Sequence, residues 1–466
     1  MSDIAVRHAV GPANPRLGRH MNMNSSPFGS IDEMSGKIAA GLSPVEIMEG
    51  CLERIREMNE HIRAMIFVNE ADALEAALQA TREIRSGHAR GPLHGVPIAV
   101  KDVLDVKHWP TTAGSRLFEN HIAQKTAVCV ANLQAAGAII IGKTNLHELC
   151  VGGHDNPWYG KVANPLDPDR GTGGTSSGSA AAVAAGFCLA AVGTDSGGSN
   201  RSPAAATGLF GYKPTNGLIA MQGVMSIAPS LDCVGVLARS VRDVRLVTEA
   251  LAGKRLTPSA SGPKNSKSRS SITVGICPEL IGAPIDKAVD IALAAMLDRP
   301  EVHRIEIAFD DREAFVAAGL TILQCEFART YRDAIERKPD LVGDAVRSFL
   351  QDGTRISADA YAGAIEIRND VRSRFLEKMA GVDALAIPTA PGAAPCLSDE
   401  LTEVNGEMVP WGMAGGRFRR WANMLGMPTL AIPVLVPDGL PVSVQLAAHP
   451  GQDSDLLDLA EMLTSN

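Results

Sequence analysis

The sequence lacks closely spaced cysteines. Of its eight cysteines, the two nearest in sequence, Cys129 and Cys150, are 21 positions apart. It therefore contains no Cys-x-x-Cys pair of the kind that binds zinc or cycles between thiol and disulfide. Several cysteines lie in apolar runs, where a free thiol behaves as a small hydrophobic group. This pattern favours reduced thiols and a cytoplasmic protein.

An excess of basic residues and a long apolar run are also missing. The chain has 44 Lys and Arg against 52 Asp and Glu, a net charge of −8. This balance argues against nucleic acid as the main partner, since neutralising phosphates requires a basic face, although it leaves room for a local basic patch. No uncharged apolar run is long enough to span a membrane, and the N-terminus has no signal-peptide pattern. With 45% hydrophobic residues, we expect a soluble protein that has a substantial core and no membrane partner.

Two apparent cofactor motifs lack the context that their chemistry requires. Gly137 to Thr144 formally matches G-x-x-x-x-G-K-[ST], but a phosphate loop is a turn that follows a strand. Here Ala138 to Ile141 has the apolar pattern of the strand itself, so we reject a nucleotide site. His147-Glu148 is not a zinc motif, because Val151 stands where H-E-x-x-H requires its second histidine. We expect no metal and no cofactor.

The chain is organised around the stretch from Gly171 to Ser202. Two hydroxyl-rich glycine turns, 171–179 and 193–199, flank a run of alanines. Ordering glycine costs more conformational entropy than ordering other residues, so two such turns indicate backbone that must pass close to something. The alanines favour a slim helix that can pack tightly on a sheet. A turn, helix, strand, turn unit would bring Thr175 and Ser199 together.

This stretch resembles the motif of the amidase signature hydrolases, Gly-Gly-Ser-Ser-Gly-Gly-Ser followed by Gly-Thr-Asp-x-Gly-Gly-Ser. The resemblance covers nearly everything after about residue 35. It implies an α/β fold, a single large domain with a mixed central β-sheet covered by helices on both faces. The other matching segments are His94–Asp102, Thr111–Ser115, Gly142–Asn145, Gly211–Thr215 and Ser230–Gly235, with weaker echoes at Ile387–Pro391 and Gly439–Gln445.

The domain organisation expected is a flexible segment over residues 1–30 and one amidase signature domain over 31–466, with a polar loop near 257–271. Alternating helical and strand patterns fit an α/β sandwich. The helices predicted are one from Ser43 onward, Glu70–Ser86, Val241–Leu251, Lys287–Met296, Arg312–Arg332 and Ala358–Met379. The strands predicted are Val96–Val100, Ala138–Ile141, Ile272–Ile276, Ala384–Ile387, Thr429–Val434 and Val442–Leu446.

The resemblance assigns three catalytic positions. Ser199 matches the nucleophile and Lys101 the base, whose pKa must fall from about 10.4 toward about 7 to 8 for it to work near neutral pH. Thr175 matches a relay serine that the family holds by a cis peptide after glycine, here Gly174. Threonine keeps the hydroxyl but stiffens χ1, and Ser176 is the fallback relay. A salt bridge from Lys101 to Asp102 or Asp105 is the structural alternative.

The turn before Ser199 offers donors for a developing oxyanion, namely the N–H groups of Ser196, Gly197, Gly198 and Ser199. We expect Thr194 and Asp195 to orient the turn and Lys101. Arg201 is expected to pair with a carboxylate. A Ser-His-Asp triad is the weaker alternative, since His94, His147 and His154 lie in no nucleophile-elbow pattern.

By family analogy the substrate pocket is lined by Cys150 and Val151, with Gly174 and Trp158 nearby. These residues are small or mostly apolar and suggest a modest, uncharged acyl group. The far wall should come from the C-terminal part, near Trp411 and Met413. The cluster Arg417 to Trp421 is left open between a solvated face and an anion site.

These observations predict a serine amidase that hydrolyses the C–N bond of a small carboxamide to a carboxylic acid and ammonia or an amine, through an acyl-Ser199 intermediate. The expected partner is the small-molecule amide, and a homodimer is left open. One alternative is a glutaminase-type subunit of an amidotransferase, although its sequence pattern is not seen between Leu320 and Gly353. The other is a non-catalytic relative that acts as a binding or scaffold protein because Thr175 disables the relay.

Overall fold

The computed structural model describes residues 28–258, 271–282, 284–437 and 439–465. Residues 1–27 of the predicted flexible segment and 259–270 of the predicted polar loop lie outside this part. Residues 28–30, which the prediction placed in the flexible segment, belong to the described part of the chain. Phe28 is buried, and Ser30 caps helix α1 (Ile31–Ala39) with a reciprocal capping box that includes Glu33. The box satisfies N–H groups that a helix start leaves without partners, so order begins before residue 31.

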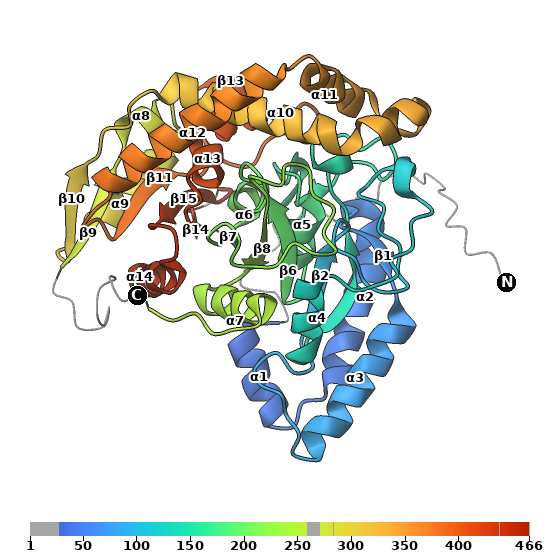
Figure 1. The fold of residues 1–466 in the computed structure, drawn as a ribbon. Coiled ribbons are helices and arrows are strands. Elements are labelled where there is room, and N and C mark those ends of the chain that lie inside the picture. Colours follow the sequence, from blue (N-terminus) through green and yellow to red (C-terminus); the bar gives the residue numbers. More distant parts are fainter. Residues whose placement is uncertain (1–27, 259–270, 283, 438, 466) are drawn as a thin grey trace.

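A mixed sheet of 11 described strands forms the centre of the molecule (Figure 1). Strand β2 pairs in parallel with β3 and β6, whereas β8 pairs antiparallel with β6 and β7. In sheet order the strands are β1 (Met65–Val68), β3 (Ile139–Thr144), β2 (Pro97–Lys101), β6 (Ala190–Asp195), β8 (Cys233–Ala238), β7 (Phe210–Lys213), β14 (Thr429–Val434), β15 (Val442–Ala447), β11 (Ala384–Pro388), β9 (Ile272–Ile276) and β10 (Val302–Glu306). The predicted mixed sheet is confirmed.

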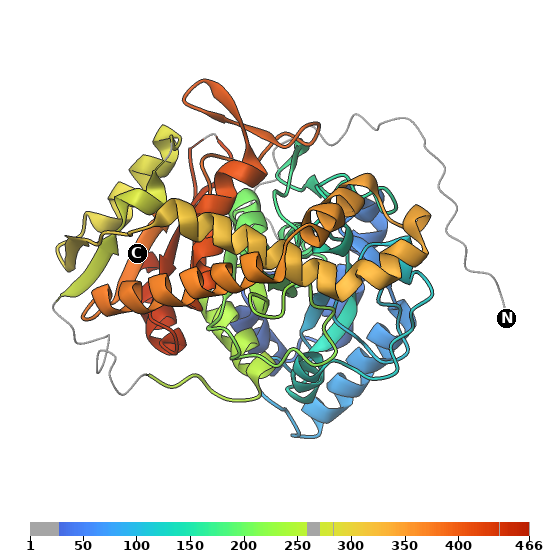
Figure 2. The same cartoon turned by 45° about the horizontal axis from the view of Figure 1, so that its top comes forward.

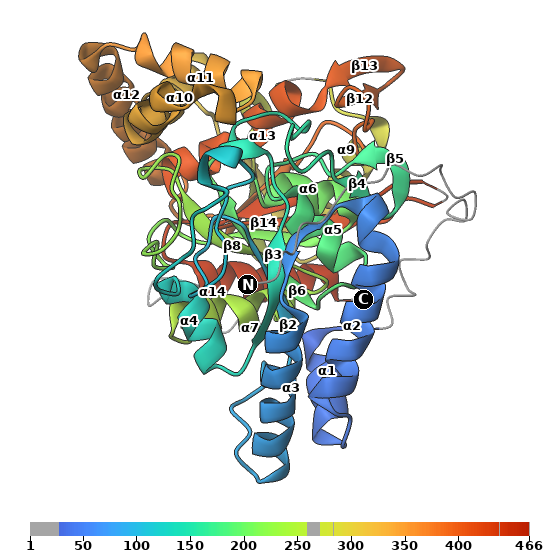
Figure 3. The ribbon, with the colours of Figure 1, turned by 90° about the vertical axis from the view of Figure 1, so that its right-hand side faces the viewer.

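Helices cover both faces of the sheet. Helices α5 and α6 pack on one face, and α7 and α14 lie on the other (Figure 3). After α1, the α-helices in chain order are α2 (Pro44–Ile62), α3 (Glu70–Arg85), α4 (Val128–Ala135), α5 (Ser177–Ala184), α6 (Arg201–Thr207), α7 (Val241–Ala252), α8 (Pro278–Ile281), α9 (Lys287–Leu297), α10 (Arg312–Arg337), α11 (Asp344–Thr354), α12 (Ala358–Lys378), α13 (Trp411–Leu425) and α14 (Asp453–Thr464). Two two-stranded sheets, β4 (Ala163–Asn164) with β5 (Asp167–Gly171) and β12 (Leu401–Val404) with β13 (Glu407–Pro410), complete the fold.

The long helices α10 and α12 run side by side across one end of the molecule (Figure 2). Helix α13 packs beneath them and contacts both, as well as α6. This arrangement carries a C-terminal helix to the middle of the molecule, next to the segment that resembles the signature motif.

The predicted elements agree with the structure to within a few residues at most boundaries. Strand β3 contains the Gly142-Lys143 pair of the apparent phosphate loop, so the glycines there are not part of a phosphate cradle. A Cβ at Gly142 would stand 2.4 Å from the carbonyl oxygen of Phe67, which means that this glycine allows β1 to approach β3. None of the described helices combines the length and the apolar character that crossing a membrane requires.

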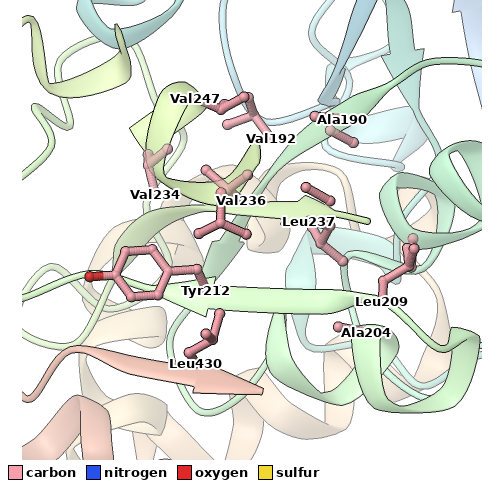
Figure 4. Packing of buried hydrophobic residues seen from close by; sticks show 14 of the residues in the cluster. Ala190, Val192, Ala204, Leu209, Tyr212, Val234, Val236, Leu237, Val247 and Leu430 are labelled. Atoms are coloured by element: carbon pink, nitrogen blue, oxygen red, sulfur yellow. The ribbon is translucent and has the colours of Figure 1, made fainter. Parts of the chain in front are cut away.

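Buried hydrophobic side chains pack together where β6, β8 and β7 meet (Figure 4). Val192, Val236 and Leu237 come from neighbouring strands and are fully buried, together with the ring of Tyr212. Strands covered on both faces read as continuous apolar runs, and β8 follows this rule because all six of its residues are buried. The core therefore fixes β6, the strand that leads into the Ser199 turn.

Leu237→Ala tests this packing. It should lower the free energy of unfolding by about 2 to 5 kcal/mol, because it removes buried methyl groups and leaves a cavity. Leu435→Ala is the matched control, since Leu435 is 63% exposed and should change stability by no more than about 0.5 kcal/mol. Urea titrations of both variants measure the difference, and equal losses would contradict this picture of the core.

Candidate active site

Helix α5 and strand β6 bring the two glycine turns together. Ser176 anchors the first turn to the second: its N–H donates to the carbonyl of Ser199 at 3.3 Å, and its hydroxyl lies 3.0 Å from Asn200 Oδ1. A Cβ at Gly193 would stand 2.2 Å from the same Asn200 oxygen and 2.7 Å from Ser176 Oγ. Glycine is thus required at 193 by close approach of side chains from both turns. Thr175 and Ser199 lie on these adjoining turns.

Lys101 ends strand β2 and is completely buried. Its Nζ lies 2.8 Å from Thr175 Oγ1, 3.0 Å from Thr194 Oγ1 and 3.1 Å from Ser176 Oγ. Among the described residues no carboxylate forms an ion pair with it. The alternative salt bridge to Asp102 is not made, because Asp102 pairs with the buried Lys143 at 2.7 Å.

Burial lowers the pKa of Lys101, although Cys150, Asp232 and Asp195 oppose the shift. Removing an ammonium from water without a paired carboxylate favours the neutral amine. A neutral amine keeps a lone pair that can accept a proton, which is what a general base needs. The Ser176 hydroxyl can direct its proton to Asn200 Oδ1 or to the Thr194 carbonyl, which leaves the hydroxyls of Thr175 and Thr194 to donate to the amine. Of these two residues Thr194 is buried, whereas Thr175 is half-buried.

The cis peptide expected at Gly174–Thr175 is not found. The described residues contain no cis peptide bonds, so this prediction was wrong. A non-proline cis bond costs about 3 to 4 kcal/mol, and the trans backbone already places the Thr175 hydroxyl 2.8 Å from Lys101. Thr175 and Gly174 are both half-buried, so solute can reach this part of the turn.

Ser199 is half-buried, and its side chain makes no hydrogen bond within the described residues. The Lys101 to Thr175 contact of the predicted relay is formed, whereas the contact from Thr175 to Ser199 is not. Catalytic hydrogen bonds are often long or absent before substrate binds. Ser199 is therefore available to a ligand.

A buried ion pair holds the Ser199 turn. Asp195 accepts two hydrogen bonds from Arg201, at 3.0 and 3.1 Å, and both side chains are fully buried. Asp195 also accepts from the N–H of Gly198 at 2.7 Å and of Asn200 at 3.2 Å. Burial opposes the charge on the Asp195 carboxyl, but Arg201 outweighs it and holds its pKa well below the usual range. Thr194, the other residue expected to orient the site, contacts Lys101.

The structure changes the set of donors available for an oxyanion. The N–H of Gly198 is already bonded to Asp195, so Gly198 was wrongly included. Gly198 instead supplies a φ of +113°, a left-handed conformation that glycine adopts without strain. The N–H groups of Ser196, Gly197 and Ser199 have no acceptor among the described residues. These three can point at one substrate oxygen, while the Ser196 hydroxyl donates to Asp232.

The pocket residues expected from family analogy fall into two groups. Cys150 is buried and lies close enough to Lys101 to affect its pKa. Leu149 and Cys150 have φ of 47° and 57°, a strained backbone of the kind that concentrates at functional sites. Val151 is half-buried beside them. Trp158 contacts other residues: its Nε1 donates to Glu148 at 2.7 Å, and Arg116 stacks on its ring.

Helix α13 supplies contacts that sequence reasoning did not assign. Trp411 Nε1 donates to the carbonyl of Gly173 at 2.6 Å, and Asn423 Nδ2 donates to the backbone and side chain of Asp195 at 2.8 and 3.0 Å. Arg419 packs against Gly198. One helix thus braces both glycine turns. More than 200 positions separate these partners, so no local spacing could have revealed the contacts.

The histidines take no part in this cluster. Burial lowers the pKa of His147 to about 4, His94 lies 3.2 Å from Glu83 and His154 lies 3.2 Å from Glu400. No histidine contacts Ser199 within the described residues, so a Ser-His-Asp triad is not formed. Within the same part of the chain no group of three or more His, Cys, Asp or Glu side chains could hold a metal ion.

This geometry, with a buried lysine, a hydroxyl relay and a glycine turn at a serine, is that of a serine hydrolase that uses lysine in place of histidine. The chain matches the family model described as Amidase over residues 46–457. It belongs to the amidase signature family and is a hydrolase that acts on C–N bonds.

Known proteins of this family are similar over nearly the whole chain. A glutamyl-tRNA(Gln) amidotransferase subunit from Anaeromyxobacter dehalogenans (strain 2CP-C) is 33% identical, covering 92% of this chain and 94% of that protein. A crystal structure of an amidase is 33% identical with a TM-score of 0.86, covering 93% and 99%. The native peptide amidase from Stenotrophomonas maltophilia is 26% identical with a TM-score of 0.79, covering 94% and 97%.

Thr175→Ser and Thr175→Val test the relay. Serine keeps the hydroxyl and should react at Ser199 at least as fast as the natural chain. Valine keeps the branched shape without the hydroxyl and should slow acylation of Ser199 by a fluorophosphonate about 10²- to 10⁴-fold, the usual contribution of proton transfer. Intact mass spectrometry follows the adduct with time. If valine reacted as fast as threonine, Thr175 would not carry the proton.

Proposed function

We propose that this protein is an amidase that hydrolyses a small carboxamide to a carboxylic acid and ammonia or an amine. The observation that carries the proposal is the completely buried Lys101, which has three hydroxyl partners and no carboxylate partner among the described residues. Burying a lysine without a carboxylate partner is unfavourable, so lysines are rarely found fully buried. Where such burial occurs beside a candidate nucleophile, it is typical of a functional base.

The reaction follows from the contacts. Thr175 passes its proton to the neutral amine of Lys101 as it accepts the proton of Ser199, and the Ser199 oxygen attacks the amide carbon. The N–H groups of Ser196, Gly197 and Ser199 stabilise the oxyanion, and each such donor contributes about 2.7 to 4 kcal/mol to transition-state stabilisation. The proton on Lys101 then returns through Thr175 to the departing nitrogen. Water, activated by the same relay, hydrolyses the acyl-Ser199 ester.

A small acyl pocket beside the nucleophile is supported by Cys150, Val151 and Gly174. Cys150 lies close enough to Lys101 to affect its pKa, and Gly174 directly precedes the relay residue Thr175. The proposed setting is cytoplasmic, in keeping with thiols that form no disulfides in the described structure. The cluster needs no cofactor for the steps above.

A second candidate is a component of an amidotransferase. It is favoured by the 33% identity over 92% of the chain to the glutamyl-tRNA(Gln) amidotransferase subunit. A third, a non-catalytic relative, is opposed by the Lys101 to Thr175 contact at 2.8 Å, since threonine keeps the hydroxyl that this relative would have lost.

The test is ammonia release by the purified chain from a panel of small carboxamides, with Ser199→Ala and Lys101→Ala as the variants. We expect turnover by the natural chain that falls at least about 10³-fold in both variants, since triad members act as a unit. The exposed Ser86→Ala is the matched control and should keep full activity.

The other candidates predict different results. An amidotransferase subunit would release ammonia from glutamine only together with partner proteins. A non-catalytic relative would form no Ser199 adduct with a fluorophosphonate. Turnover that persisted in Ser199→Ala would contradict the proposed mechanism.

A further inference from the structure

Two consecutive arginines of helix α13 lie against the glycines of the Ser199 turn. A Cβ built on Gly198 would stand 2.5 Å from Arg419 Nε, and one built on Gly197 would stand 3.3 Å from Arg420 Nε. The absence of side chains at these two positions lets both guanidinium groups approach the turn. The turn that supplies the proposed oxyanion donors is therefore flanked by positive charge.

The two arginines differ in how they are held. Arg419 is 4% exposed, donates from Nη1 to the carbonyl of Thr389 at 2.7 Å, and accepts on its own carbonyl from Arg201 at 2.9 Å. These contacts tie Arg419 into the buried network around Asp195. Arg419 serves as a brace of the turn.

Arg420 makes no comparable hydrogen bonds within the described residues. Its Nε is buried without a hydrogen-bond partner, and within the described residues its guanidinium has neither a carboxylate nor a carbonyl to bind. Its stem packs against Gly319 of α10, where a Cβ would stand 3.1 Å from Arg420 Cδ. The residue as a whole is half-buried, so part of it stays accessible to solute. A desolvated guanidinium that lacks an anion is unfavourable, and an anionic ligand would relieve that cost.

Arg312, at the start of α10, is a further arginine whose buried Nε has no hydrogen-bond partner among the described residues. The acidic side chains next to Arg312 in sequence do not neutralise this region, because Asp310 binds Lys378 at 2.6 Å and Asp311 binds Arg374 at 2.8 Å. In a chain of net charge −8, the two arginines beside Gly197 and Gly198 make this turn locally basic, which favours anions.

We propose that Arg420 forms a carboxylate subsite, which selects amides whose acyl chain ends in a carboxylate, that is, half-amides of short dicarboxylic acids. The inference rests on the proposed function. Gly197 belongs to the turn that would hold the acyl oxygen, so a group beside Gly197 flanks the acyl part of a bound amide. Consecutive Cα atoms are about 3.8 Å apart, so Arg420 Nε lies within roughly 12 Å of the Ser199 Cα. A guanidinium binds a carboxylate through two parallel hydrogen bonds.

This assignment modifies the expectation of an uncharged acyl group. Small apolar residues near Cys150 can enclose the methylene groups next to the amide, while Arg420 receives the charged end. For the cluster from Arg417 to Trp421, the sequence left two interpretations open, a solvated face and an anion site. The proposal assigns the anion site.

The test compares succinamate with butanamide, which has the same chain length but ends in a methyl group. We expect the natural chain to show kcat/KM at least tenfold higher for succinamate, and Arg420→Met to lower that ratio at least tenfold. Arg420→Lys keeps the charge without the planar fork and should give an intermediate ratio. Arg329→Met removes an exposed arginine of α10 and should leave the ratio within twofold.

Binding is measured separately from turnover. Titration calorimetry on Ser199→Ala should show succinamate binding at least tenfold more tightly than butanamide, with the preference lost when Arg420→Met is added. Circular dichroism checks that each variant is folded, and Arg420→Gln replaces Arg420→Met if the latter is not.

The outcomes separate the two proposals. Hydrolysis of butanamide without a preference for succinamate, or a ratio unchanged in a folded Arg420 variant, overturns the subsite and leaves the amidase proposal intact. Arg420-dependent binding of succinamate without hydrolysis of either amide supports the subsite and contradicts the amidase proposal.

Discussion

The site depends on one constraint, the burial of Lys101 without an ion pair to any described carboxylate. Lys143, equally buried, has the carboxylate of Asp102 at 2.7 Å. Among the described residues, the Nζ of Lys101 instead has three hydroxyls within hydrogen-bond distance, those of Thr175, Thr194 and Ser176. Burial without an opposite charge lowers the pKa of an amine. Of these two buried lysines, Lys101 is therefore the one that is prepared to act as a base.

The buried Asp195 near Lys101 is paired, which limits how far its charge stabilises a charged amine at Lys101. Asp195 would stabilise an ammonium at Lys101 if it were unpaired, but Arg201 binds it through two hydrogen bonds, and its remaining acceptor capacity goes to Gly198, Asn200 and Asn423. These bonds also shape the turn at the nucleophile. Helix α13 completes the arrangement from the C-terminal part of the chain, which makes an intact fold a condition for a formed site.

Much of the fold was predictable because the pattern is local. Strand β3 follows from its apolar run, and the close approach of the glycine turns follows from a slim helix between them. The commitment of the Gly198 N–H to Asp195 could not be predicted, because it depends on the side-chain geometry within the turn. The contact of Trp411 with Gly173 and the position of Arg420 beside Gly197 could not be predicted either, since they depend on how a distant helix packs. Sequence periodicity identifies which elements form, whereas long-range packing decides which of their atoms meet.

The most direct test of the account is the pH dependence of Ser199 acylation by a fluorophosphonate, which requires no knowledge of the substrate. Below the pKa of Lys101 the amine is protonated and cannot accept a proton, so the rate should rise with pH. Its midpoint should lie below the ordinary lysine value of about 10.4, and the permanently charged Lys101→Arg should react at least about 10²-fold more slowly throughout. A rate independent of pH, or one unaffected by Lys101→Arg in a folded variant, would contradict the neutral-lysine mechanism.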